Sequence, residues 1–123
     1  MSTQANQERF AAKLLFQFRV EQRGISNKRR ICECRTVLFH ALSPRKALQL
    51  ATKRGRDSQH SYQNEEGATV YFEFVGVEEL LHLGIECDTD EVWYDMFEML
   101  EPMERSKLLI PSPEKLRAIS RAR

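Results

Sequence analysis

The residues of this chain that could bind a metal are three cysteines and three histidines. Cys32 and Cys34 are separated by one residue in a β-prone run, which places both sulfurs on the same face of a strand. A structural zinc site usually has four ligands, in pairs separated by two to four residues. Here only Cys87 and three histidines that are distant in the sequence could complete such a set. We therefore expect half-buried thiols and no bound zinc.

Carboxylates and histidines offer little further chemistry. Asp88, Asp90 and Glu91 could hold a hard cation, but their loop lacks the length and the glycine of a calcium-binding loop. Histidines near a serine or a glutamate can be paired on paper. However, the sequence has no triad spacing, nucleophile elbow, phosphate-binding loop or paired-metal motif. We therefore expect no enzymatic activity and no cofactor.

The charged residues are sorted by sign along the chain. The net charge is only +1, but residues 1–56 carry +10, residues 57–104 carry −14 and residues 105–123 carry +5. An asymmetry of this size points to binding partners. In the simpler interpretation, the oppositely charged blocks pair with each other inside one fold.

Basic residues of the first half could line one surface and contact phosphates, which makes nucleic-acid binding one alternative function. No aromatic residues are interleaved with them for base stacking, and the acidic middle of the chain would repel nucleic acid unless it faced away. The candidate basic patch consists of Arg19, Lys28, Arg29, Arg30, Arg35 and Arg45.

Acidic residues of the second half, interleaved with apolar ones, favour a surface that captures protein. An immunity protein or antitoxin that covers a basic toxin would use such a surface, so this is a second alternative function. In a competing interpretation, Trp93 and Phe97 point the same way from a strand and belong to the core. The candidate partner-binding residues are Glu73, Tyr71, Glu78, Glu79, Asp88, Asp90 and Glu91.

These residues are positioned by strands, one helix and a turn. Alternation of apolar and polar residues predicts a strand over residues 10–20, and the β-rich run 31–40 pairs with it in an antiparallel hairpin. Ser43 and Pro44 predict the start of a helix that ends near Gly55. Residues 57–63 form a weak strand candidate.

The second half of the chain begins with a turn. Asn64 to Gly67 predicts a turn with Gly67 at positive φ, followed by an interior strand with a bulge or a close backbone approach at Gly76. Residues 77–83 are predicted as a helical turn closed by Gly84. Residues 91–100 fit a strand or a helix, and the aromatic residues favour a strand over 93–97. Two helical stretches follow, the second opened by Ser112 and Pro113.

The expected fold is α+β: an antiparallel sheet of four or five strands with one main helix packed on one face, plus short C-terminal helices. Residues 1–104 form one domain and residues 105–123 a basic helical tail. The odd cysteine count, the polar N-terminus and the absence of a long apolar run favour a cytoplasmic protein with no secretory signal and no membrane span.

A series of motifs in this chain resembles a family of small bacterial domains of unknown function. The order of the motifs is more specific than any single motif. The resemblance covers about residues 9 to 98 and implies an α+β domain in a bacterial cytoplasm, without activity, cofactor or catalytic residues. The motifs are Phe10-Ala-Ala-Lys13-Leu-Leu-Phe16, Cys34-Arg35 with Val37-Leu38, Tyr62-x-Asn64-x-x-Gly67, Tyr71-Phe-Glu-Phe-Val-Gly-Val77 and Glu91-Val-Trp-Tyr94.

The sequence therefore favours a non-catalytic bacterial module whose charge-sorted surface recognises a protein partner or another copy of itself. Two alternative functions remain: nucleic-acid binding, and a role as an immunity protein or antitoxin that covers a basic toxin.

Overall fold

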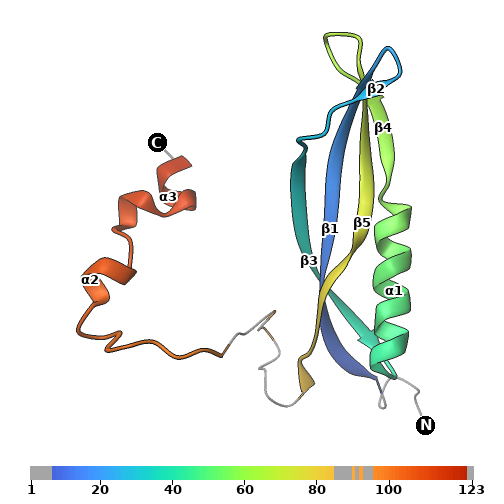
Figure 1. Cartoon of the computed structure of the whole chain (residues 1–123). Helices are drawn as coiled ribbons and strands as arrows, with labels where there is room; N and C mark the ends of the chain where they lie inside the picture. The colour runs from blue at the N-terminus through green and yellow to red at the C-terminus, as the bar shows by residue number, and fades with distance from the viewer. Residues whose placement is uncertain (1–6, 85–89, 91, 93–95, 122–123) are drawn as a thin grey trace.

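The computed structural model of the protein describes residues 7–84, 90, 92 and 96–121. It confirms the predicted α+β class, because α1 packs against an antiparallel sheet of five strands (Figure 1). In chain order the elements are β1 Glu8–Gln22, β2 Ile25–Ser26, β3 Ile31–Ala41, α1 Pro44–Asp57, β4 His60–Gln63, β5 Thr69–His82, α2 Ser106–Leu109, the 3-10 helix η3 Pro113–Lys115 and α3 Arg117–Arg121.

The long strand β1 lies at the centre of the sheet. β3 pairs along one side of it and β5 along the other, while β2 adds two residues at its end and β4 lies outside β5. The period-two pattern of β1 places the apolar side chains at positions 10, 12, 14 and 16 on one face, and each is at most 1% exposed. This face carries the core that α1 covers, which confirms the predicted strand and hairpin.

Helix α1 begins as the sequence predicts. The Ser43 side chain accepts a hydrogen bond from the backbone nitrogen of Lys46 at 3.1 Å, and Pro44 is the first helical residue. The predicted end at Gly55 is wrong, because the helix continues to Asp57 and is capped by Ser58.

Gly55 lies inside α1 because the helix approaches β5 closely there. Together with Ala47 and Ala51 it forms a stripe of small buried residues spaced four apart along one side of the helix. A Cβ at position 55 would come within 2.3 Å of the Phe74 ring. The glycine is therefore needed for packing. Local helix-stop chemistry could not indicate this need, because the close contact is with a residue of β5.

The turn between β4 and β5 has the predicted chemistry. The Asn64 side chain accepts hydrogen bonds from the backbone nitrogens of Glu66 and Ala68, both at 3.0 Å, and Gly67 has φ +80°. β4 is shorter than the predicted strand because Asp57 is the last residue of α1 and Ser58 caps this helix.

The predicted helical turn over residues 77–83 is wrong, because β5 continues to His82. This part of β5 pairs with the first half of β1, and the pairing continues as far as Phe10 with His82. The predicted irregularity at Gly76 takes the form of two register shifts, in which Val75 and Glu78 have no partner in β1.

The predicted strand over residues 93–97 is not formed at its described positions, since Met96 and Phe97 have no regular secondary structure. Residues 93–95, including Trp93, lie outside the described residues. Phe97 is 75% exposed, so its placement in the core is wrong. The fifth strand of the sheet is β2 instead.

The C-terminal helices are short, as predicted. The Ser112 side chain makes no capping hydrogen bond, and Pro113 opens only a 3-10 turn rather than the predicted basic helix. Helices of this length cannot be stable alone. None of the described helices is long and apolar enough to cross a membrane.

Candidate protein-interaction site

Two of the candidate partner-binding residues, Tyr71 and Glu73, lie together with Arg19 on the face of the sheet opposite α1. Arg19 donates two hydrogen bonds to the Glu73 carboxylate, from Nε to Oε1 at 2.9 Å and from Nη2 to Oε2 at 3.0 Å. Gln17 Nε2 donates a third to Oε1 at 2.9 Å, and the Arg19 guanidinium lies 4.2 Å from the Tyr71 ring centroid. The pair joins a predicted basic residue to a predicted acidic one, so their charges compensate within the domain.

This arrangement shifts the pKa values of both charged groups. The hydrogen bond from Arg19 lowers the pKa of Glu73 below its ordinary value, partial burial opposes this, and the bond from Gln17 adds to the lowering. The hydrogen bond to Glu73 raises the pKa of Arg19. The ion pair holds the ends of β1 and β5 together, which indicates a structural role for Glu73.

Substitution Glu73→Gln should leave the domain folded but reduce the loss of folding stability that occurs as the pH falls. Because the folded pKa of Glu73 is lowered, its contribution to stability is present above the ordinary glutamate pKa and is lost as the pH falls through the folded pKa. Urea unfolding at neutral and acid pH measures this difference. The matched control is Glu66→Gln in the exposed turn. An equal loss of stability on acidification in Glu73→Gln and the wild type would contradict the structural role.

The remaining acidic candidates do not gather around Glu73. Glu79 faces Lys13 across the β1–β5 pairing, and Glu78 is the exposed extra residue at a register shift of β5. Asp90 is exposed, while Asp88 and Glu91 lie outside the described residues. The structure therefore does not combine the described acidic candidates into one patch.

The six candidate basic residues do not share one surface either. In the strand register, Arg19 pairs with Tyr71 on the helix-free face, whereas Arg35 pairs with Leu14 on the face that α1 covers. Arg35 forms an ion pair with Glu33. Its guanidinium also lies 5.2 and 4.9 Å from the ring centroids of two core phenylalanines.

The other four basic candidates lie at both ends of the sheet (Figure 1). Lys28 and Arg29 are exposed on the connection between β2 and β3, where Arg30 is bound to Asn27 and Gln17. Arg45 lies at the start of α1, at the opposite end. The structure gives the nucleic-acid alternative no common surface built from these residues.

The two described cysteines are free thiols. Cys32 and Cys34 lie on the same face of β3, as predicted, but both are exposed rather than half-buried. Cys87 lies outside the described residues. Within the described part of the chain, no group of three or more histidine, cysteine, aspartate or glutamate residues could hold a metal ion.

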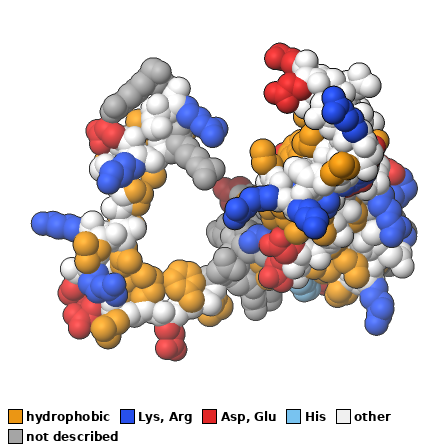
Figure 2. All heavy atoms as spheres, turned by 45° about the horizontal axis from the view of Figure 1, so that its top comes forward, with side chains coloured by type: hydrophobic (Ala, Val, Ile, Leu, Met, Phe, Trp, Pro, Cys, Tyr) orange, Lys and Arg blue, Asp and Glu red, His pale blue; other side chains and the backbone are white. Residues whose placement is uncertain are grey.

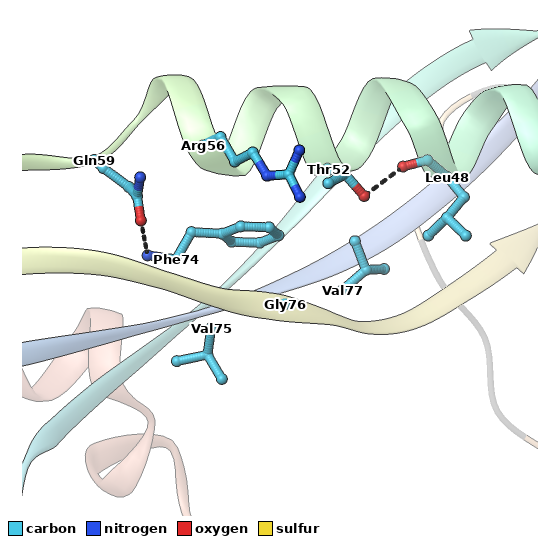
Figure 3. A pocket seen from close by; sticks show the side chains of 8 residues that line it. All are labelled: Leu48, Thr52, Arg56, Gln59, Phe74, Val75, Gly76 and Val77. Atoms are coloured by element: carbon cyan, nitrogen blue, oxygen red, sulfur yellow. Dashed lines mark hydrogen bonds between the residues drawn. The ribbon is translucent and has the colours of Figure 1, made fainter.

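A groove between α1 and β5 was not predicted from the sequence. Leu48, Thr52 and Arg56, spaced four residues apart on one side of α1, face Phe74 and Val77 of β5 across a cavity of about 470 Å³ (Figure 3). We call it the α1–β5 groove. The helical spacing of positions 48, 52 and 56 is the signal that could have indicated it.

Beside this groove, β5 has an open edge. β4 pairs with β5 only as far as Phe72, while β1 pairs with it as far as His82. The Phe74 backbone nitrogen is satisfied by Gln59 Oε1 at 3.0 Å. Beyond this point, no described strand lies along the outer edge of β5. Such an edge can accept an added strand.

Residues 96–104 expose large apolar side chains to solvent, and we call them the Met-rich stretch. Met96, Phe97, Leu100 and Met103 are 73–89% exposed. Figure 1 shows the chain running away from the sheet here, and Figure 2 shows hydrophobic side chains gathered along it. Further along the described chain, neither α2 nor α3 contacts α1 or a strand.

Together the antiparallel sheet and the helix packed on it define a small α+β domain. Residues 9–92 match the family described as "Domain of unknown function (DUF4288)", and the chain belongs to this family. The match confirms the resemblance to a family of unknown function and ends a few residues before the predicted limit. No match was found among curated proteins or among solved structures.

Proposed function

We propose that the chain is a non-catalytic protein-binding module and that its partner is another copy of itself. The observation that carries this proposal is the exposure of the Met-rich stretch, whose apolar side chains extend from a folded domain into solvent. Contiguous exposed apolar surface of this kind is typical of protein interfaces. Methionine, which accounts for three of the nine residues, is typical of adaptable binding surfaces.

The non-catalytic part of the proposal is supported by where the shifted pKa values occur. Glu73 and Arg19 are shifted by their mutual ion pair, and the pKa of Lys53 is raised by its hydrogen bond to Asp57. Both pairs hold surface side chains in place, whereas catalytic groups with shifted pKa values are typically found in clefts.

Self-association is supported by the charges of the chain. Residues 57–104 contain no lysine or arginine, while the residues before and after them are strongly basic. The Arg19–Glu73 pair compensates only part of these charges. Two copies can place an acidic block of one chain against a basic block of the other, which also predicts that salt weakens the association.

Sedimentation equilibrium of the full chain over a series of concentrations, at low and high salt, tests this proposal. We expect a monomer–dimer equilibrium that shifts toward monomer at high salt. The substitutions Phe97→Ser and Leu100→Ser together should raise the dissociation constant by more than about 100-fold, because burial of each side chain contributes about 1.5–3 kcal/mol.

The matched control is Ile25→Ser with Ile31→Ser, since these isoleucines are 75–76% exposed but lie on β2 and β3. The control should associate like the wild type. A chain that stays monomeric at every concentration and at both salt concentrations would refute self-association.

A further inference from the structure

We propose that the Met-rich stretch of one copy binds in the α1–β5 groove of a second copy, with its backbone along the open edge of β5. This inference rests on the proposed self-association. It adds the surface on each copy and the residues that determine the strength of the contact.

The shape and lining of the groove suit an extended apolar segment. Leu48 is 43% exposed and, with Phe74 and Val77, provides an apolar wall. Gly76 lies at the same place, and a Cβ built on it would meet nothing within 4 Å. A second backbone can therefore approach β5 there.

The backbone of β5 can bind such a segment over a short length. Its outer edge beyond Phe74 has no described strand beside it, and residues 96–99 of the Met-rich stretch have no regular secondary structure. The register shifts at Val75 and Glu78 interrupt the edge, so a long added strand would not fit. We therefore expect the segment to bind through a few backbone hydrogen bonds to β5 and through side-chain contacts in the groove.

The charges of the two surfaces are opposite. α1 carries five basic residues and one acidic residue, and Arg56 lies in the groove itself (Figure 3). The Met-rich stretch carries Glu98, Glu101 and Glu104 and no basic residue. The negative stretch is therefore attracted to the positive side of the groove, and like charges would oppose a basic segment there.

A second copy is the occupant because each chain presents both surfaces without joining them. Within one chain, the Met-rich stretch runs away from the sheet (Figure 1). None of its residues lines the groove. If two copies exchange their stretches, each groove is filled and the pair closes with two-fold symmetry. This exchange also covers the apolar side chains that one chain leaves in solvent.

The charge contact is tested with Arg56→Glu in the full chain. We expect the dissociation constant of the dimer to rise at least about tenfold, because the two-fold pair contains this charge contact twice and the substitution changes both. Arg54→Glu is the matched control, because it makes the same charge change on α1 at an exposed residue that does not line the groove. The pair Arg56→Glu with Glu98→Arg should recover most of the wild-type affinity. Equal effects of Arg56→Glu and Arg54→Glu would overturn the assignment of the groove.

The contact itself is tested by cross-linking between differently substituted chains, after serine has replaced the native cysteines. A mixture of Val77→Cys and Met99→Cys chains should give a disulfide-linked dimer on mild oxidation. A mixture of Thr36→Cys and Met99→Cys chains is the control, since Thr36 is exposed on β3 and lies outside the groove. It should give little product.

The outcomes separate this inference from the proposed function. A dimer by sedimentation without the Val77–Met99 cross-link would overturn the groove as the contact and leave self-association intact. A cross-link that forms within a single doubly substituted chain, and not between chains, would show that the stretch folds back on its own sheet and would overturn the second copy as occupant. A monomer under all conditions removes both proposals.

Discussion

Replacement of Phe72 by alanine is expected to lower the free energy of unfolding by about 3–5 kcal/mol, the range found for phenylalanine truncation in protein cores. Phe72 is 1% exposed and stacks on Phe16 with the ring centroids 4.6 Å apart. Phe18 and His60 contact the same ring at 4.9 and 5.1 Å. The truncation therefore opens a cavity where β1, β4 and β5 meet, and a domain of this size has little stability to spare.

Urea unfolding at neutral pH measures this loss, with Val75→Ala as the matched control. Val75 lies on the same strand, but it is 57% exposed and has no partner in β1. Its truncation should cost about 0.5 kcal/mol or less. Similar losses in the two variants would contradict the placement of the core at Phe72.

Local chemistry was enough to predict the elements whose residues interact with near neighbours. The alternation along β1 predicts a strand because one face is buried, and Ser43 with Pro44 predicts a helix start because both residues act within one turn. Asn64 and Gly67 predict the turn for the same reason. These predictions needed no knowledge of distant contacts.

The wrong predictions concern features that depend on distant parts of the chain. The sequence of residues 77–83 is compatible with a helical turn, but pairing with β1 extends β5 as far as His82. Local chemistry predicts a helix stop at Gly55. Instead, Gly55 lies inside the helix, because the ring of Phe74, nineteen positions later, leaves no space for a Cβ there. Tertiary packing overrides local propensity at both places.

The types of residue in the candidate site could be predicted from the sequence, but their positions in the fold could not. Arg19 and Glu73 lie 54 positions apart, in blocks of opposite charge. Only the antiparallel register of β1 and β5 brings them into one ion pair. The helical spacing of positions 48, 52 and 56 indicates which side of α1 could line a groove, but the position of β5 opposite that side depends on tertiary packing. The apolar character of the Met-rich stretch was visible, but its exposure was not, because the aromatic run favoured a buried strand.

Substitution Gly55→Ala is expected to destabilise the domain, although the same change in an ordinary helix interior stabilises by about 0.5–1 kcal/mol. The added Cβ would come within 2.3 Å of the Phe74 ring, and overpacking of this kind costs about 1–3 kcal/mol. We therefore expect a net loss of about 1 kcal/mol in urea unfolding. A gain in stability would contradict the close packing of α1 on β5.

The double variant Gly55→Ala with Phe74→Ala separates the clash from other effects of the new methyl group. Once the ring is removed, Gly55→Ala should become stabilising, so the two substitutions should not be additive.

The same clash also affects the proposed binding surface. Phe74 lines the α1–β5 groove, so a ring displaced by the new methyl group would move into the space assigned to the Met-rich stretch of the second copy. Gly55→Ala should therefore weaken dimer formation as well as folding, and sedimentation of the folded variant would detect that second effect.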